Sequence, residues 1–277
     1  MEKKKIKVNL HITQLCNYAC KYCFAHFANS CNLLLAQWMQ IIDNLAASGQ
    51  VYAINFAGGE PVLYPHFSEL LHYAYHKGFN VSIISNGSLL LNKHLMPAAD
   101  FALLDTLGIS VDSFQPTILR SLGCCNRSRE IFTLDDFVQL TSKAREINPA
   151  IKLKINTVVS KLNYQEKLTD LTNEIKIDRW KYLKIKYFRD DQHSNEDLLI
   201  SDSEYDQFVQ QNGLLGGRAV VERSLTGSYI MIDNKGNLVD DHCDNYQTVG
   251  NLLEESFGPI FQRYNFEAEN YYSRYTE

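Results

Sequence analysis

The fold is decided by the stretch Cys16-Asn17-Tyr18-Ala19-Cys20-Lys21-Tyr22-Cys23-Phe24. Three thiols fall within eight residues, with three and then two positions between them. Three thiolates in so short a loop can hold three irons of a cubane cluster and leave the fourth iron open, much as catalytic metal sites keep one position free. Zinc is the alternative, with Cys31 and His26 as further ligands, although zinc sites usually combine two separated ligand pairs. The spacing favours the iron–sulfur cluster.

The composition is that of a globular protein with ordinary charge. The chain has 277 residues, of which 45% are hydrophobic and 21% charged, and one α/β unit of this length can bury a full core. Its formal net charge of −5 argues against a general nucleic-acid binder, whose surface is usually basic. We therefore expect no nucleic-acid polymer among its partners.

The cysteines and the first residues indicate a reducing compartment. Seven cysteines occur, and those outside the short loop are scattered, unlike a secreted disulfide framework. Residues 1–5 lead into a strand pattern, and no apolar run is long enough for a signal peptide or a membrane span. We expect a cytoplasmic protein that does not enter a membrane.

Strand and helix patterns alternate along residues 1–188. Apolar periodicity predicts strands at residues 5–13, 53–57, 80–85, 107–112, 151–159 and 180–188. Helical spacing predicts helices at residues 34–48, 67–77, 134–147 and 164–175, with another between the third and fourth strands. This order predicts an α/β fold, in which six units form a partial (β/α)6 barrel with outer helices.

The pattern changes after residue 188. A polar loop at residues 189–195 precedes an expected helix at 203–212, and residues 229–239 are expected to form a β-hairpin. The aromatic and acidic tail predicts no particular element. We therefore divide the chain into a barrel at 1–188 and an extension at 189–277 that packs on the barrel and closes it.

Polar residues recur at a period of two along the expected strands, where a covered parallel sheet should be apolar. They are Asn9, His11, Asn55, Gly108, Ser110, Asp112, Lys154, Asn156, Arg179 and Lys181. A polar face on five strands predicts an interior that holds a polar ligand. The cations Lys154, Arg179 and Lys181 would converge on one anion, such as a triphosphate, because burying them without a counter-charge is costly.

Further polar groups follow the second, third and fourth strands. The turn Gly58-Gly59-Glu60-Pro61 combines glycines that allow close backbone approach with a carboxylate that can accept from an ammonium. Ser85-Asn86-Gly87 and Ser110-Val111-Asp112 end the next two strands, where ligands of such sheets bind. Helix capping or turn chemistry is the alternative for either.

Two levels of resemblance follow from these motifs. The spacing CxxxCxYC, followed by Gly58-Gly59-Glu60-Pro61 on the next strand, resembles the radical SAM enzymes. Over about residues 6–240 the chain is similar to viperin and its microbial relatives. The motifs, in order, are Asn9-Leu10-His11, Asn55-Phe56-Ala57-Gly58-Gly59-Glu60-Pro61, Ser85-Asn86-Gly87-Ser88-Leu89, Ser110-Val111-Asp112-Ser113-Phe114, Lys154-Ile155-Asn156, Arg179-Trp180-Lys181 and Ser228-Tyr229.

The resemblance implies cofactors and site residues. Its metal ligands would be Cys16, Cys20 and Cys23, holding a [4Fe-4S] cluster. S-adenosyl-L-methionine would be seated by Gly58, Gly59, Glu60, Ser85, Asn86, Ser110 and Asp112. The substrate would contact Asn9 near the nucleobase, the cations Lys154, Arg179 and Lys181 at the triphosphate, and His11, Asn55 and Asn156 on the same face. Tyr229 would deliver the final hydrogen or electron, or else be a packed aromatic of the hairpin.

The resemblance also implies an activity. Viperins convert a ribonucleoside triphosphate to its 3′-deoxy-3′,4′-didehydro form, a chain terminator for viral polymerases. We expect a lyase-type enzyme of phage defence that prefers CTP or UTP, with GTP as the runner-up, and that draws electrons from a flavodoxin or ferredoxin. Two positions depart from animal viperins: Ala53 stands where they carry a lysine, and Cys124 where they carry an arginine, for which Arg127 is a replacement candidate.

Two other functions compete. Another radical SAM enzyme, such as a peptide-modifying maturase, would usually carry a cysteine-rich extension, whereas only Cys243 lies beyond Cys125 here. A non-enzymatic metal-binding module would leave Glu60 and the inward cations unexplained.

Overall fold

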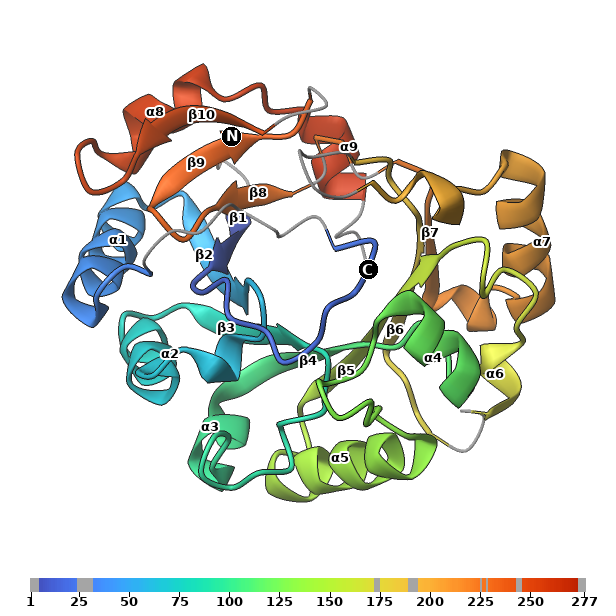
Figure 1. Cartoon of the computed structure of the whole chain (residues 1–277). Helices are drawn as coiled ribbons and strands as arrows, with labels where there is room; N and C mark the ends of the chain where they lie inside the picture. Colours follow the sequence, from blue (N-terminus) through green and yellow to red (C-terminus); the bar gives the residue numbers. More distant parts are fainter. Residues whose placement is uncertain are drawn as a thin grey trace.

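The computed structural model contains one curved sheet of ten strands, and it describes residues 5–23, 32–171, 175–188, 194–224, 226–227, 229–242 and 246–273 (Figure 1). The order across the sheet is β10-β9-β8-β1-β2-β3-β4-β5-β6-β7. The strands are β1 Ile6–His11, β2 Val51–Ala57, β3 Asn80–Ser85, β4 Leu104–Ser110, β5 Lys152–Val159, β6 Arg179–Lys184, β7 Ala219–Glu222, β8 Ile230–Ile232, β9 Asn237–Asp240 and β10 Gln247–Asn251.

Helices cover the outer face of this sheet (Figure 1). The α-helices are α1 Leu35–Ser48, α2 Phe67–His76, α3 Ala98–Leu103, α4 Pro116–Leu122, α5 Leu134–Ile147, α6 Leu168–Leu171, α7 Asp202–Asn212, α8 Phe257–Arg263 and α9 Ala268–Ser273. The single-turn 3-10 helices are η1 Pro61–Leu63, η2 Glu196–Leu198 and η3 Leu215–Gly217.

The six expected units are present, and their strands β1 to β6 pair in chain order, all parallel. Parallel neighbours require a crossover connection, and outer helices provide it here. For example, α1 buries Trp38, Ile41 and Leu45 and ends at Gly49, whose φ of 63° is left-handed. The partial (β/α)6 barrel and the antiparallel hairpin of β8 and β9 are therefore confirmed.

Some elements differ from expectation. The strand β6 stops at Lys184 rather than residue 188, because Asn195 bonds the backbone of Lys186 and Phe188 instead. The helix expected at 164–175 is the single turn α6 in its described part. The strand β4 ends two residues before Asp112. The strand β7 was not expected, and its four residues are too few for a periodic pattern.

The chain beyond residue 188 extends the sheet at both edges. The strand β7 pairs with β6, and β8 pairs with β1 on the opposite edge, both in parallel. The strands β9 and β10 continue outward from β8 as antiparallel neighbours. The tail, for which the sequence predicted nothing, contributes β10, α8 and α9. A boundary at residue 188 stays a prediction.

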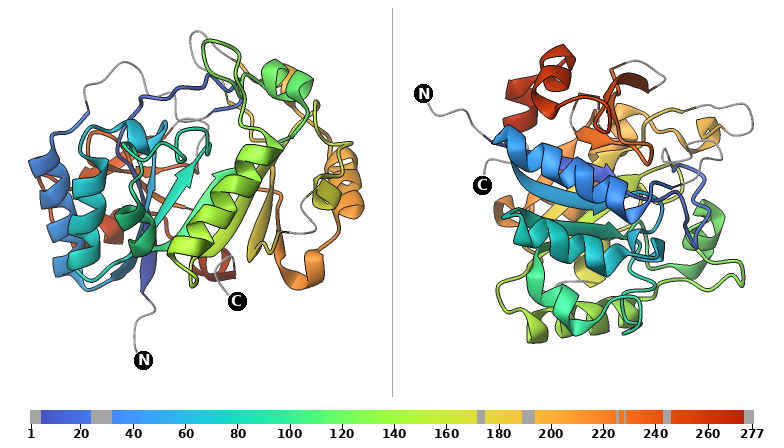
Figure 2. Two further views of the ribbon diagram at one scale, coloured as in Figure 1. Left: turned by 90° about the horizontal axis from the view of Figure 1, so that it is seen from below. Right: turned by 90° about the vertical axis from the view of Figure 1, so that its left-hand side faces the viewer.

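The segment after β1 crosses the carboxyl ends of the strands, at the end of the barrel opposite the start of β1 (Figure 2). This edge is where parallel sheets bind ligands. Within the described ranges, no helix is both long and apolar enough to cross a membrane.

The helix α9 ties down the start of β1. Tyr271 is 2% exposed; its hydroxyl accepts from the Lys7 amide (2.6 Å) and donates to the Lys7 carbonyl (2.9 Å). Pairing with β8 begins only at Val8, so this hydroxyl takes the place of a strand partner.

We expect Tyr271→Phe to lower the free energy of unfolding by about 1–3 kcal/mol, because it leaves the buried amide and carbonyl of Lys7 without this hydrogen-bond partner. Urea unfolding measures this, with exposed Tyr75→Phe as the control; equal midpoints for the two variants would contradict the role.

Candidate active site

The loop that carries the cysteines is clamped by the end of β2. The Gly59 amide donates to the Thr13 carbonyl and the Glu60 amide to the Leu15 carbonyl, both at 2.7 Å. A Cβ on Gly58 would lie 2.4 Å from the Thr13 oxygen, and one on Gly59 would lie 2.3 Å from the Leu15 oxygen. The backbone that these glycines approach most closely is therefore the protein's own, just before Cys16.

The turn after α4 clamps the same loop from another side. The Ala19 amide donates to the Gly123 carbonyl (3.2 Å), and the Lys21 amide donates to the Leu122 carbonyl (2.9 Å). Gly123 has a φ of 79°, and a Cβ there would lie 2.2 Å from the Ala19 oxygen. Only glycine fits this contact without displacing the loop.

Asp112, expected at the cofactor, also supports the loop. It is 3% exposed, and its carboxylate accepts from the Val158 amide (2.7 Å) and from the Tyr22 hydroxyl. The Cys124 thiol lies 3.3 Å from the same hydroxyl. Burial raises the pKa of Asp112 to about 6, against the hydrogen bonds that lower it. Tyr22, which precedes Cys23, is thus connected to β5 through hydrogen bonds to the Asp112 carboxylate.

The three expected metal ligands, Cys16, Cys20 and Cys23, are free thiols in one loop. The pKa of Cys16 is raised to about 11, mainly by burial and to a lesser extent by the charges of Glu60 and Cys23. The pKa of Cys20 is raised by a hydrogen bond with Cys124, by burial and by Cys23. Cys16 and Cys20 therefore resist ionisation without a metal, and metal cations stabilise thiolates. With Cys23 in the same loop, the three residues fit an iron–sulfur cluster. Cys31 and His26, the alternative zinc ligands, lie outside the described residues.

Glu60 fits an ammonium group. It is fully buried and accepts from the Ser85 hydroxyl (2.8 Å) and from the Asn86 amide (2.9 Å). Burial raises the pKa of Glu60 to about 7, because these neutral donors compensate the charge only in part. In the described part of the chain no cation lies within ion-pair distance of it, so the amine of S-adenosylmethionine would supply the missing charge.

A pocket joins the remaining expected cofactor residues to the cluster loop. Its lining comprises Tyr18, Cys20, Tyr22, Asn86, Ser110, Val111, Asp112, Ser113, Phe114, Leu119, Cys124 and Phe132. Asn86 also donates to the Asn17 side chain (2.9 Å). The pocket therefore places Asn86, Ser110 and Asp112 beside Cys20 of the cluster loop. Ser85 does not line the pocket and instead donates a hydrogen bond to Glu60.

The polar interior face is present. Asn9, His11, Asn55 and Asn156 are all at least 92% buried. The Asn55 side chain donates to that of Asn9 (2.6 Å), which donates to the Ile230 carbonyl (3.4 Å). Gly108 is in register with Lys154 and Arg179, and Ser110 with Asn156 and Lys181, so the expected residues of three strands share one face. Burial lowers the pKa of His11 to about 4, which keeps its ring neutral.

The inward cations are not equivalent. Lys181 is 1% exposed and forms an ion pair with Glu222 of β7, a residue that sequence reasoning missed together with its strand. Tyr229 joins them, donating to Glu222 (2.7 Å) and accepting from Lys181 (3.1 Å). Lys154, by contrast, makes no ion pair with any residue described. The pKa of Lys154 lies well below its usual value, first because of burial and then because of the nearby charges of Lys181 and Lys7.

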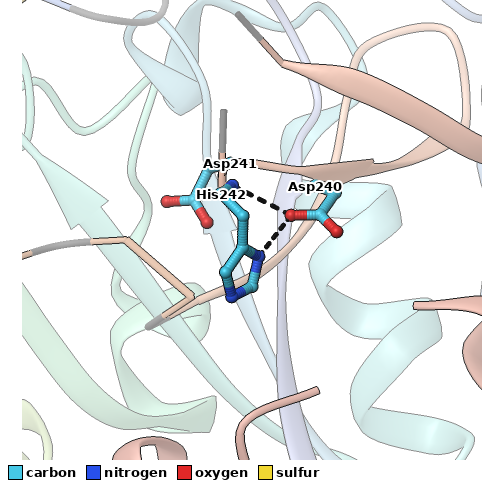
Figure 3. A group of neighbouring side chains, drawn as sticks. All are labelled: Asp240, Asp241 and His242. Carbon is cyan, nitrogen blue, oxygen red and sulfur yellow. Dashed lines mark hydrogen bonds and ion pairs between the residues drawn. The ribbon is translucent and has the colours of Figure 1, made fainter. Parts of the chain in front are cut away.

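A separate group of chelating side chains lies at the end of β9, where Asp240, Asp241 and His242 meet (Figure 3). These groups already have protein partners: Asp240 accepts from the His242 ring, and Asp241 accepts from the Gly227 amide (2.8 Å). Burial disfavours the charged imidazole, but Asp240 and Glu267 outweigh it and raise the pKa of His242. The group is an ion-pair cluster within the extension.

Comparison with known proteins defines the class and then the family. The family model of the Radical SAM superfamily matches residues 10–166, which include the end of β1, the cluster loop and β2 to β5. The solved structure of Streptococcus suis SuiB bound to S-adenosylmethionine has a TM-score of 0.69 at 16% identity, over 94% of this chain and 66% of that one. Native anSMEcpe with bound AdoMet and a peptide gives 0.70 at 14%, over 98% and 84%. These two structures share the fold.

The sequence relatives are closer. An S-adenosylmethionine-dependent nucleotide dehydratase from Selenomonas ruminantium is 52% identical over 269 residues, which cover 97% of this chain and 98% of the relative. A protein of the same name from Psychrobacter lutiphocae is 31% identical over 292 residues, covering 98% and 95%. The chain therefore belongs to the radical SAM superfamily and, within it, to the viperin-like S-adenosylmethionine-dependent nucleotide dehydratases. It is an enzyme that uses a [4Fe-4S] cluster and S-adenosylmethionine.

The contact at Gly123 makes a prediction about cluster loading. We expect Gly123→Ala to retain less iron after anaerobic reconstitution than the natural chain, because its Cβ displaces Ala19 and hence the loop. Gly49→Ala is the matched control, since Gly49 is also left-handed (φ 63°) but has no atom within 4 Å of the added Cβ. Both variants lose about 1–2 kcal/mol to backbone strain. Equal iron contents in the two variants would show that the clamp does not position the loop.

The buried carboxylate makes a prediction about pH. Glu60 loses its proton near pH 7, so its attraction for the amine of S-adenosylmethionine should be weak at pH 6 and complete at pH 8. Affinity should rise about tenfold per pH unit below this pKa and then level. Calorimetry on reconstituted protein measures the profile, and Glu60→Gln should give a flat, weaker one. A rise of the same size in Glu60→Gln would assign the titration to another group.

Proposed function

We propose that this enzyme removes water from the ribose of a ribonucleoside triphosphate and forms the 3′-deoxy-3′,4′-didehydro analogue. The observation that carries the proposal is the partly buried Lys154, which faces the barrel interior beside Arg179 and has no counter-ion among the described residues. A cation in such a place gains most from an anionic ligand. The names of the relatives, nucleotide dehydratases, support the same substrate class.

The residues divide the work by position. When bound, the cluster and S-adenosylmethionine supply the one-electron chemistry, on Cys16, Cys20, Cys23 and the Glu60 turn. Lys154 and Arg179 hold the phosphates and so fix the ribose beneath the cluster loop. Tyr229 can deliver a hydrogen, because its hydroxyl lies between Lys181 and Glu222. In this arrangement Lys181 acts on Tyr229 as well as on the phosphates, since Glu222 already balances its charge.

A pyrimidine is the proposed base, as CTP or UTP, with GTP as the runner-up. The side-chain amide of Asn9 donates one hydrogen bond to the Ile230 carbonyl and accepts one from Asn55. One N–H and one oxygen lone pair of this amide remain for a ligand. A group that can both donate and accept is able to read the exocyclic edge of a base. A site built on such hydrogen bonds discriminates strongly, because the wrong base leaves buried polar groups unpaired.

The product suggests a biological role. A nucleotide without a 3′-hydroxyl stops a polymerase that incorporates it, so we propose that the product acts against phage replication. Each turnover needs two electrons, one to cleave S-adenosylmethionine and one to complete the alkene, and both would come from a small carrier such as a flavodoxin or ferredoxin. Cys16 is exposed, which gives such a carrier access to the cluster loop.

The direct test is product formation. The anaerobically reconstituted enzyme is incubated with each of the four ribonucleoside triphosphates, a reductant and S-adenosylmethionine, and the products are identified by mass spectrometry. We expect a product one water lighter than its substrate, formed fastest from CTP or UTP. Absence of any dehydrated nucleotide would overturn the proposal, and a dehydrated purine nucleotide alone would overturn the proposed base.

Lys154 gives the matching mutational prediction. Lys154→Met should weaken triphosphate binding by about 1.5–3 kcal/mol, the value of a charge-assisted contact, while S-adenosylmethionine cleavage without nucleotide persists. Lys184→Met on the outer face of β6 is the control, because Lys184 pairs with Asp202 (2.8 Å) away from the interior. Calorimetry that finds unchanged triphosphate affinity in folded Lys154→Met would remove this cation from the site.

A further inference from the structure

Lys7 faces the barrel interior from the start of β1. It shares the face of Asn9 and His11, because side chains alternate along a strand. Its register partner on β2 is Ala53, and an irregularity between Ile6 and Lys7 sets this pairing. A shift of one residue would pair Lys7 with Tyr52, which is 36% exposed and points to the other side. The small Ala53 side chain leaves room for the lysine.

The ammonium of Lys7 has little to compensate its charge. It donates to the Ser82 hydroxyl (3.3 Å), and no carboxylate of the described residues lies within ion-pair distance. Burial lowers the pKa of Lys7; the charge of Asp105 opposes this shift, and those of Lys152 and Arg179 add to it. Neutral Ser82 cannot balance a cation.

Lys7 belongs to the same cation group as the proposed phosphate residues. Its charge lowers the pKa of Lys154, and the charge of Arg179 lowers the pKa of both. Cations from β1, β5 and β6 therefore face one another across the interior. Such mutual repulsion is relieved by a single polyanion that touches all three.

The backbone of Lys7 is fixed as well. The Tyr271 hydroxyl bonds its amide (2.6 Å) and its carbonyl (2.9 Å), although β8 does not reach this residue. The long side chain therefore projects from a defined point, and less freedom is lost when it binds a ligand.

We propose that Lys7 binds the terminal phosphate of the nucleoside triphosphate, together with Ser82, and so selects for the triphosphate over shorter phosphate chains. The inference rests on the proposed function. The assignment to the terminal phosphate follows from position along β1. The reacting ribose must lie near the cluster loop at the carboxyl ends of the strands, whereas Lys7 lies four residues before His11, about 13 Å toward the opposite end.

The test compares the mono-, di- and triphosphates of one nucleoside, by calorimetry on the reconstituted enzyme. In the natural chain the triphosphate should bind tightest. Lys7→Met should lower triphosphate affinity about tenfold or more and leave monophosphate affinity unchanged, so that the selectivity collapses. Lys7→Gln, which can still bond Ser82, should behave in the same way and serves if the methionine variant does not fold.

Two further variants make the result specific. Lys152→Met removes the same charge from a side chain that is 55% exposed at the start of β5, and it should keep the natural selectivity. Adding Ala53→Lys to Lys7→Met returns a cation to the same register pair and should restore triphosphate preference. Unchanged selectivity in folded Lys7→Met, or an equal loss in Lys152→Met, would overturn the role of Lys7. Failure of the natural chain to bind any nucleoside triphosphate would overturn the proposed function itself.

Discussion

Close contact between backbones is the constraint on which the rest of the structure depends. The loop of Cys16 to Cys23 has no helix or strand of its own, so other elements must hold it. The end of β2 does so at Gly58 and Gly59, and the turn after α4 does so at Gly123, each at a distance that excludes a Cβ. Because the turn after β2 also carries Glu60, the same contact sets the loop and the proposed amine site relative to each other. The positions of the cluster and of S-adenosylmethionine are thus coupled through one turn.

Charge in the barrel interior decides what the enzyme can bind. Lys181 is balanced by Glu222, and this pair gives Tyr229 a polar setting without needing a ligand. Lys7 and Lys154 have no such partner among the residues described, and burial disfavours their charge. The folded chain therefore contains interior cations whose charge is not balanced until an anionic ligand binds. Binding and orientation of the phosphates then follow from the same interaction.

The sequence predicted most of the fold and part of the site. Six strand and helix units, the hairpin and the cluster loop are readable because each has its own periodicity or spacing. The roles of Asp112 and Gly123 were not readable, since their partners Tyr22 and Ala19 lie about a hundred residues earlier in the chain. Glu222 was missed because β7 is too short for a pattern. Lys7 alternates with Asn9 and His11 in the sequence, but its role depends on the register with Ala53 and the hydrogen bond to Ser82, which only the structure shows.

The most direct test of this account is whether phosphates are needed to engage the site. The measurement is the rate of 5′-deoxyadenosine release from S-adenosylmethionine by the reconstituted enzyme, with each ribonucleoside triphosphate or with the corresponding nucleoside. The account predicts that a triphosphate accelerates release and that its nucleoside does not, because only the triphosphate brings an anion to Lys154. Equal acceleration by the nucleoside, or no acceleration by any triphosphate, would contradict it.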